Sequence, residues 1–503
     1  MTIESNKERI LISERAGEFR KEQKVECKTS IPTDSVKKMI FVTAYPYLLR
    51  QESTENSVNY SGKVSFFICY EDQDGELRKC ECEKEFNGEI LDLVLPERVD
   101  LRITPTVEKT EADLSGVHLA VNCQLLTEVQ IKTRLEREYL VGGENLICDL
   151  KEEEITVSLG QRNTNYTVEE EYEVNYSIAE VLYQSADCVI TDSQCGVGCI
   201  IVDGQVNLSQ ILLQSGEKRD IIKESRSVPF RAEIDCEEAM PALTSSAYCL
   251  VKSFKTDITV DGEQGKSQIQ WRVNLSLFGE GYKQEQIIRV CDAFSLDSEI
   301  ELESQNLLSQ TEKNYPNVEE KLVQKTNIEE LPVGAIYSCV LGERAFITSQ
   351  ETVENGISVT GVCQGTAIFL GGEGKVFSRK LEAPFMSLLK VETEELDKVS
   401  VSVCAKNMGL KVISLDGGEI TCELCFSPSI VKTEEVKLVK EAVKVKEKER
   451  ENSAISVYIP QKEEGLFPLA KRLNVHPNEL LLTNKEIQFP LTGEERIVVF
   501  RQK

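Results

Sequence analysis

Two histidines and one cysteine motif are the first residues of this chain that could carry chemistry. His118 and His476 are its only histidines, and neither lies near a group of cysteines or histidines that would bind zinc or form a catalytic site. Cys422-x-x-Cys425 has redox spacing, but it lies in an alternating segment, where residues three apart point to opposite faces. We therefore expect structural roles for all four residues.

Two further motifs resemble functional sites only in part. Gly371-Gly-Glu-Gly-Lys375 resembles a phosphate-binding loop, which needs a glycine five residues before its Gly-Lys pair and a serine or threonine after it. Those positions hold Phe369 and Val376, so we expect a hairpin turn. Cys80-x-Cys82 lacks a second pair of ligands. The sequence predicts no catalytic, cofactor or metal site, which favours a non-enzymatic protein over an enzyme of unknown type.

A glycine pattern occurs three times along the chain, about 150 residues apart. Each copy has a glycine in an apolar segment and a phenylalanine 24, 26 or 24 residues later. The pairs are Gly62 and Phe86, Gly204 and Phe230, and Gly361 and Phe385, and a later glycine (Gly116, Gly265, Gly418) opens an alternating segment. Solenoid repeats span roughly 20–50 residues. The longer period indicates tandem domains, and we expect Gly62, Gly204 and Gly361 to be equivalent.

Each copy contains segments with a period of two. Residues 268–277 place apolar side chains at odd positions and polar ones at even positions, and residues 117–125 and 419–426 resemble them. Such alternation is typical of antiparallel sheets with one face on a core and one in water. The expected fold class is mainly β, with three tandem antiparallel β domains over 25–142, 172–293 and 322–430.

The composition limits the partners and the compartment. The chain has 503 residues and a net charge of −27, and its first 429 residues carry about −29. Nucleic acid and anionic lipid would repel such a protein. The chain has no run of about 18 apolar residues, so no transmembrane segment is predicted. The first ten residues lack an apolar signal region. Seventeen cysteines, an odd number, suit a reducing compartment. We expect a cytoplasmic protein with reduced thiols.

The amino-acid composition of the chain changes after the third copy. Residues 431–454 are rich in lysine, glutamate and valine, and they predict a charged tether that is helical or disordered. Residues 455–503 are close to neutral and predict a strand, a helix with Leu466, Leu469 and Ala470 on one face, a break at Asn474, a second helix and a closing strand. This order predicts a small βααβ domain.

The C-terminal segment resembles a LysM domain. The resemblance rests on Leu466-Phe-Pro-Leu-Ala-Lys-Arg472, the Asn474-Val break, Leu480, the Asn484 loop and the Gly493 turn. It implies a groove between two loops, Glu463-Glu464-Gly465 and Thr483-Asn484-Lys485. The usual Gly-Asp-Thr of the first loop is replaced here by two glutamates and a glycine. Phe467 lies beside these loops, so we expect Phe467 and Asn484 to contact a partner.

The whole arrangement resembles sporulation proteins in which tandem SPOCS domains precede a tether and a C-terminal LysM. In the first copy Glu85 stands where the other two have proline before the phenylalanine. The resemblance implies a spore coat morphogenetic adaptor in the mother cell, at the forespore surface. It would bind a SpoIVA-like coat ATPase through its LysM, without cofactors. The alternative is a LysM anchor that binds peptidoglycan, here the cortex glycan.

Overall fold

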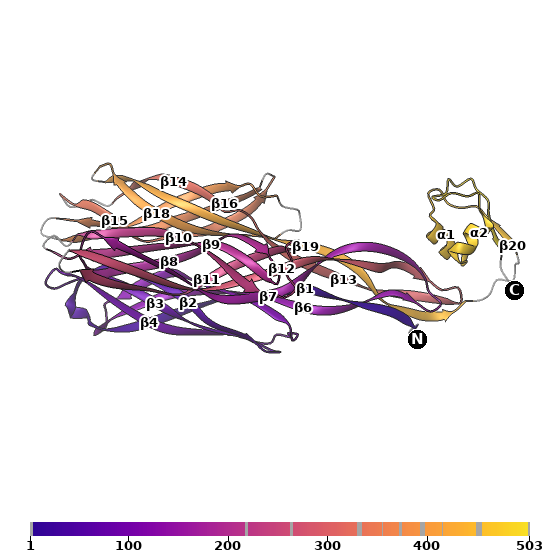
Figure 1. The fold of residues 1–503 in the computed structure, drawn as a ribbon, viewed down its shortest axis with the longest axis horizontal. Coiled ribbons are helices and arrows are strands. Elements are labelled where there is room, and N and C mark those ends of the chain that lie inside the picture. Colours follow the sequence, from indigo (N-terminus) through magenta and orange to yellow (C-terminus); the bar gives the residue numbers. More distant parts are fainter. Residues whose placement is uncertain are drawn as a thin grey trace.

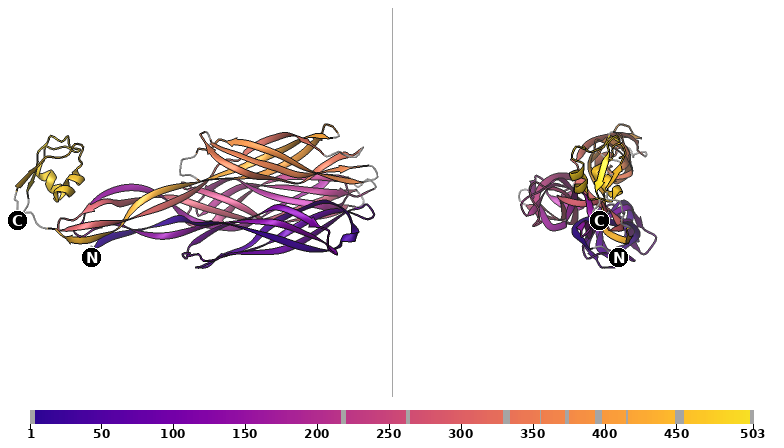
Figure 2. Two further views of the ribbon diagram at one scale, coloured as in Figure 1. Left: turned by 180° about the vertical axis from the view of Figure 1, so that it is seen from behind. Right: turned by 90° about the vertical axis from the view of Figure 1, so that its right-hand side faces the viewer.

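The protein has a three-lobed body, a long stalk and a small module at the far end of the stalk (Figure 1). The computed structural model describes residues 4–500 except 217–219, 262–264, 329–333, 355, 372–374, 393–397, 415 and 449–454. Strands make up most of the described chain, so the predicted mainly β class is confirmed. Seen along the long axis, the three lobes surround a common centre (Figure 2).

Each lobe is one copy of the repeated sequence. Copy one contains β1 (Ser5–Pro32), β2 (Val36–Ser53), β3 (Val58–Asp72), β4 (Leu77–Ile90), β5 (Val99–Asp113) and β6 (His118–Gly143), with a short 3-10 turn over Thr33–Ser35. Copy two contains β7 (Ile147–Val174), β8 (Ile178–Cys195), β9 (Cys199–Gln214), β10 (Ile221–Asp235), β11 (Thr244–Asp261) and β12 (Lys266–Phe294). All three copies begin before the limits predicted from the sequence.

Copy three repeats this order with its first strand divided in two. It contains β13 (Ser298–Asn314), β14 (Val318–Asn327), β15 (Ile336–Val353), β16 (Gly356–Leu370), β17 (Val376–Leu389), β18 (Lys398–Val412) and β19 (Gly417–Glu447). The division falls at Tyr315-Pro316-Asn317. Proline has no backbone N–H to donate to a strand ladder, which explains the interruption.

Every copy folds into two packed antiparallel sheets. One sheet pairs the second, third and fourth strands (β2-β3-β4, β8-β9-β10, β15-β16-β17), and the other places the long last strand between the first and fifth (β1-β6-β5, β7-β12-β11, β14-β19-β18). The alternating residues fill the space between the sheets. In β12, for example, Ile269, Trp271 and Val273 are fully buried in the core of copy two.

The repeated glycine and phenylalanine are partners across neighbouring strands. Gly62 lies opposite Phe86, Gly204 opposite Phe230 and Gly361 opposite Phe385. In each pair the phenylalanine ring lies over the glycine. A Cβ added to Gly62, Gly204 or Gly361 would lie only 2.5, 2.4 or 2.3 Å from that ring, respectively. The predicted equivalence of the three glycines is confirmed, and the spacing of 24–26 residues is the length of the hairpin that joins them.

The copies pack against one another around a central axis. Three cross-strand pairs, one from each copy, meet there in a shared apolar core: Phe41 with Cys69, Tyr183 with Ile211, and Cys339 with Ile368. These pairs come from the same two strands of each copy. The body is therefore a single-chain assembly with approximate threefold symmetry rather than a row of separate domains.

The stalk is formed by the long strands where they extend beyond the lobes. β1 with β6, β7 with β12, and β13 with β19 form three two-stranded ribbons. Their inward side chains make a core of nine buried residues: Ile10, Ile12, Tyr139, Ile155, Val157, Ile287, Leu307, Val436 and Leu438. The ribbons twist together and end at the C-terminal module (Figure 2).

The stalk corrects the prediction of a charged tether over 431–454. Residues 431–447 are the second half of β19, paired with β13 throughout. Val436 and Leu438 face the stalk core, while alternate lysines and glutamates face water. A register shift near Val439 moves the buried face, so Val439 and Ala442 are also buried. Residues 449–454, the rest of the predicted tether, lie outside the described residues.

The glycine–phenylalanine pairs lead to a stability prediction. Gly361→Ala should lower the free energy of unfolding by about 1–3 kcal/mol, because the new Cβ would lie 2.3 Å from the Phe385 ring and 2.2 Å from the Phe346 carbonyl oxygen. Urea denaturation measures this. Gly142→Ala is the matched control, since nothing lies within 4 Å of a Cβ there. Equal stability of the two variants would contradict the role of the pair.

Candidate functional site

The C-terminal module is a small domain with two helices and two strands. It consists of β20 (Ile455–Tyr458), α1 (Leu466–Leu473), α2 (Pro477–Thr483) and β21 (Ile497–Phe500), in the predicted βααβ order. Leu469, Ala470 and Leu480 form its core together with residues of β21, as expected, and Leu466 packs against that core. Asn474 ends α1 in the left-handed conformation, which explains the break there.

The loop before α1 is held by an internal ion pair. The Glu464 carboxylate accepts hydrogen bonds from Arg472 Nε and Nη2 at 2.9 and 2.8 Å and from the Gln461 backbone N–H at 2.9 Å. The Arg472 hydrogen bond lowers the pKa of Glu464. Gly465 is the N-cap of α1, and Glu463 has a positive φ of 63°. Glu464 therefore shapes this loop and does not project into a groove.

Asn484 fixes the second loop from within. Its Nδ2 donates to the Leu480 carbonyl at 2.9 Å and to the Val498 carbonyl at 2.8 Å, and its Oδ1 accepts from the Val498 N–H at 2.8 Å. The side chain thus joins the end of α2 to β21, which indicates a structural role. Of the predicted groove residues, Glu463 and Lys485 have exposed side chains.

The first loop is also joined to the segment that precedes β21. The Glu463 N–H donates to the Leu491 carbonyl at 2.7 Å, and the Leu491 N–H donates to the Glu464 carbonyl at 3.0 Å. Leu491 itself is buried in the module core. The first of the two loops expected to flank a groove is therefore held by backbone hydrogen bonds to Leu491.

Phe467 contacts the stalk. Its ring lies edge-on to Phe294 at the end of β12, with centroids 5.5 Å apart. Lys471 Nζ forms an ion pair with Asp292 at 2.6 Å. Asn474 Nδ2 donates to the Leu296 carbonyl at 2.9 Å. The module is therefore docked on the tip of the stalk through α1, and the side chain predicted to anchor a partner instead anchors this intramolecular contact.

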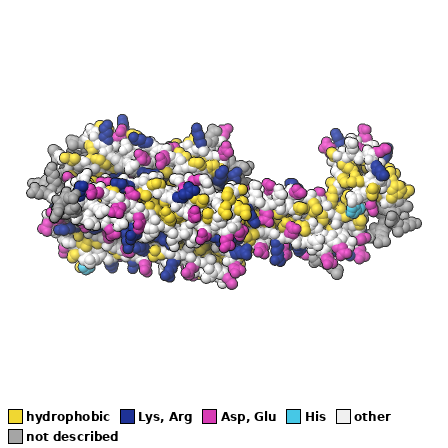
Figure 3. All heavy atoms as spheres, in the orientation of Figure 1, with side chains coloured by type: hydrophobic (Ala, Val, Ile, Leu, Met, Phe, Trp, Pro, Cys, Tyr) yellow, Lys and Arg dark blue, Asp and Glu magenta, His cyan; other side chains and the backbone are white. Residues whose placement is uncertain are grey.

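An exposed apolar surface lies on the other side of the module. On the β20–β21 ribbon, Ile455 lies opposite Phe500 and Val457 opposite Val498. Ile455, Val457 and Phe500 are 60%, 59% and 54% exposed, and Ile459 beyond the strand is also exposed. We call Ile455, Val457, Ile459, Val498 and Phe500 the ribbon patch. Apolar side chains are visible on the surface of the module in Figure 3. This surface was not predicted from the sequence, although the alternation Ile-Ser-Val-Tyr-Ile459 could have indicated it.

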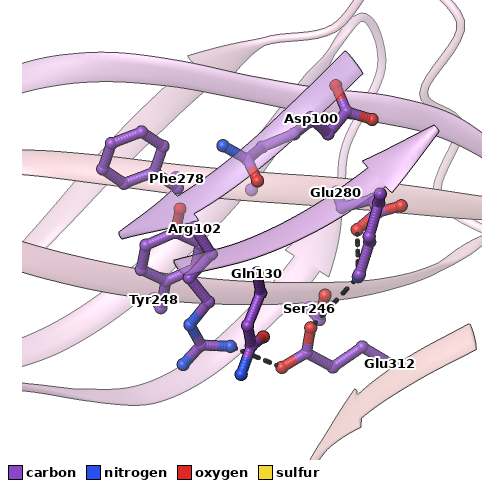
Figure 4. A pocket seen from close by; sticks show the side chains of 11 residues that line it. Asp100, Arg102, Gln130, Ser246, Tyr248, Phe278, Glu280 and Glu312 are labelled. Carbon is purple, nitrogen blue, oxygen red and sulfur yellow. Dashed lines mark hydrogen bonds and ion pairs between the residues drawn. The ribbon is translucent and has the colours of Figure 1, made fainter. Parts of the chain in front are cut away.

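The main buried charged cluster lies where the three copies meet (Figure 4). Lys132 of copy one is 3.0 Å from the Glu280 carboxylate of copy two and 3.3 Å from Glu312 of copy three. Arg102 of copy one is 2.8 Å from Glu312 and lies over the Tyr248 ring, 4.4 Å from its centroid. Acids and bases from different copies neutralise one another here.

This cluster joins the copies. A small pocket beside it has about 20 Å³, enough for one water molecule, and Arg102 and Glu312 also line a larger cleft. Burial alone would raise the pKa of Glu312, but Arg102 and Lys132 outweigh it and lower that pKa to about 2. Glu312 therefore stays ionised in the folded protein. The cluster is best explained as an ion network that holds the three copies in register.

The remaining chemical candidates lie apart from one another. His118 is exposed at the start of β6, and His476 accepts a hydrogen bond from the Asn478 N–H at the start of α2. Cys422 lies in the core of copy three, whereas Cys425 lines a cleft outside that core, so the two point to opposite faces as predicted. Within the described residues, no group of three or more histidine, cysteine or acidic side chains could hold a metal ion.

In comparisons with known proteins, no family model, no curated protein and no solved structure matches the chain. In the part of the chain that the structure describes, no helix is long and apolar enough to span a membrane.

The charged cluster predicts how stability depends on pH. A carboxylate whose pKa falls on folding stabilises the fold above its unfolded pKa of about 4.3, and this contribution disappears as the pH falls through its folded value. With the pKa of Glu312 at about 2, the contribution is about 3 kcal/mol at neutral pH. Glu312→Gln should lack this contribution at pH 7. Its free energy of unfolding should therefore fall less than that of the wild type between pH 4 and 2.

Chemical denaturation at several pH values measures this effect. Glu303→Gln is the control, because Glu303 is exposed on the same strand. If both variants have the same stability as the wild type at pH 7, the ion network does not hold the copies together.

The stalk contact gives a third prediction. A double variant, Phe467→Ala with Lys471→Glu, removes both the ring contact and the ion pair with Asp292. We expect the module to leave the stalk, so that small-angle X-ray scattering shows a wider range of maximum dimensions. Lys485→Glu changes an exposed lysine of the same module and should leave the scattering unchanged. A double variant that scatters like the wild type would show that other contacts hold the module.

Proposed function

We propose that this protein is a non-enzymatic adaptor in assembly of the spore coat or envelope. The proposal rests first on the sequence resemblance to proteins with tandem SPOCS domains and a C-terminal LysM. Three β copies followed by a βααβ module agree with that order. In this proposal the protein acts in the mother cell at the forespore surface.

The observation that carries the proposal is the position of the module. It sits at the tip of a stalk, away from the lobes, and α1 fixes it there (Figure 1). Three long ribbons hold this one small domain at a distance from the body. Such a shape suits a protein that positions a binding domain relative to a large acidic surface.

The ribbon patch is the surface we propose for the partner. Its side chains face outward while the helices cover the opposite face of the ribbon. Contiguous exposed apolar side chains on a small domain are typical of protein interaction sites. Residues 455–503 carry seven lysines and arginines against six acidic residues, so an acidic partner is not repelled there as it would be by the lobes.

We propose a SpoIVA-like coat ATPase as the partner, and the family resemblance is the basis for this choice. Binding to cortex peptidoglycan is the alternative that a LysM domain suggests. The structure lends this alternative less support, because Glu464 and Asn484 of the expected groove are engaged in internal hydrogen bonds.

A binding experiment with the full chain distinguishes these functions. Immobilised wild type is tested against the coat ATPase and, in parallel, against purified cortex glycan. We expect Val457→Asp to weaken ATPase binding at least about tenfold, as loss of a central interface side chain does. The variant should remain folded because Val457 is exposed. Glu479→Gln, at an exposed position of α2 outside the two loops, is the control on the same module.

Deletion of residues 455–503 provides the cellular test. We expect the truncated protein to leave the forespore surface. Normal localisation of the truncated protein would make the three copies the recruiting part. Binding to glycan but not to the ATPase would replace the adaptor function with peptidoglycan anchoring.

A further inference from the structure

A large cleft between copies two and three is lined by an unusual number of cysteines. Its volume is about 1010 Å³, and its walls come from β8 and β11 of copy two, β18 and β19 of copy three, residues 311–317, and Arg102 and Thr104 of β5 in copy one. Five of the seventeen cysteines of the chain line it: Cys188, Cys195, Cys249, Cys404 and Cys425. Small molecules can therefore reach a set of thiols that an ordinary β core would enclose.

Two of these cysteines lie on neighbouring sheet edges. β8 and β11 are edge strands of the two sheets of copy two, and they run side by side in opposite directions. Several side-chain contacts fix their register: Cys195 Sγ with the Thr244 carbonyl at 3.4 Å, Ser193 Oγ with the Ser245 carbonyl at 3.3 Å, and Gln184 Nε2 with the Phe254 carbonyl at 3.5 Å. Continuing this register places Cys188 opposite Leu250, the neighbour of Cys249.

The two thiols lie near each other. Cys188 and Cys249 both line the cleft, and both pack against the core of copy two while remaining half-buried. Burial and the neighbouring Cys249 thiol raise the pKa of Cys188. A thiol with a raised pKa forms little thiolate. Access through the cleft is therefore what would favour oxidation of this pair over the buried cysteines.

Other cysteine pairs lack this combination of proximity and access. Cys363 and Cys422 lie near each other, but both are fully buried in the core of copy three and neither lines the cleft. Cys404 lies directly opposite Cys425 in the β18–β19 ladder, yet its thiol is directed to the Ala405 carbonyl at 3.8 Å.

The third neighbouring pair is reached from one side only. Cys27 lies near Cys82, and Cys82 lines a smaller cleft, whereas Cys27 is buried and directed to the Glu83 carbonyl at 3.6 Å. Cys188 and Cys249 are the neighbouring pair whose two members both line a cleft.

We propose that Cys188 and Cys249 are an oxidative modification site, at which a small disulfide entering the cleft produces an intramolecular disulfide. One thiolate attacks the sulfur–sulfur bond of the oxidant and releases one small thiol. The second thiolate then attacks the mixed disulfide and releases the other. The protein loses two protons and two electrons, and the oxidant is reduced to two thiols.

The product would fasten the free edges of the two sheets in copy two. Cys249 follows Cys188 by 61 positions, so the bond closes a long loop, which restricts the unfolded chain. Oxidation should then raise the resistance of copy two to unfolding once the protein leaves reducing conditions. This inference does not depend on the proposed adaptor function.

The test uses the folded full chain and oxidised glutathione. After incubation, free thiols are alkylated, the protein is digested without reduction, and linked peptides are identified by mass spectrometry. We expect the Cys188–Cys249 link to form first, while Cys363 and Cys422 remain unlinked as the buried control pair. With Cys249→Ser, Cys188 should instead retain one glutathione as a mixed disulfide.

Thermal unfolding is the second measurement. Oxidation should raise the midpoint of the wild type and leave that of Cys188→Ser unchanged. The proposal is overturned if Cys188 and Cys249 are recovered as free thiols after prolonged treatment. It is equally overturned if Cys404–Cys425 or Cys363–Cys422 links form before theirs. Should a serine variant fail to fold, the linked peptides of the wild type still decide between these results.

Discussion

A two-stranded ribbon cannot bury its own apolar face, and the rest of this structure depends on that constraint. Isolated hairpins are at best marginally stable in water. Here three such ribbons extend from three lobes, and Ile12, Val157 and Leu438 of different copies meet inside the stalk. Each copy therefore completes the hydrophobic core of the other two. The same long strands continue into the lobes, so the packing of the stalk also determines how the lobes are arranged.

The charged cluster at the centre adds orientation to this hydrophobic packing. Lys132, Glu280 and Glu312 come from three different copies, and each ion needs partners supplied by its neighbours. Buried ions left unpaired are strongly destabilising, so a displaced copy would be penalised. Apolar packing at the axis tolerates small rotations, whereas the ion network admits one register. The cluster thus explains why a fold made of three similar units adopts one arrangement.

The features that depend on local pattern could be predicted from the sequence. Strand alternation in 268–277 and the spacing of Gly204 and Phe230 identified the sheets and the equivalent positions, because both follow from residues within one hairpin. The stalk could not be predicted in this way. Lysine and glutamate dominate residues 431–447. Val436 and Leu438 are buried only because ribbons more than 100 residues away in the sequence pack against them.

The same limit applies to the module. The helix face of Leu469 and Ala470 was visible in the sequence, but the role of Phe467 depends on Phe294, which lies in copy two, more than 170 residues earlier in the chain. Asn484 looked like a groove residue because of its loop, and its hydrogen bonds to Leu480 and Val498 give it a structural role. The ribbon patch is better placed to meet a partner, since docking on the stalk leaves it exposed.

The central claim is that the three copies form one cooperative unit, and differential scanning calorimetry tests it most directly. If each copy completes the cores of the others, residues 4–447 should unfold in a single transition whose calorimetric and van't Hoff enthalpies agree. Three separate transitions, or a van't Hoff enthalpy about three times smaller than the calorimetric one, would show that the copies are independent domains and would contradict this account.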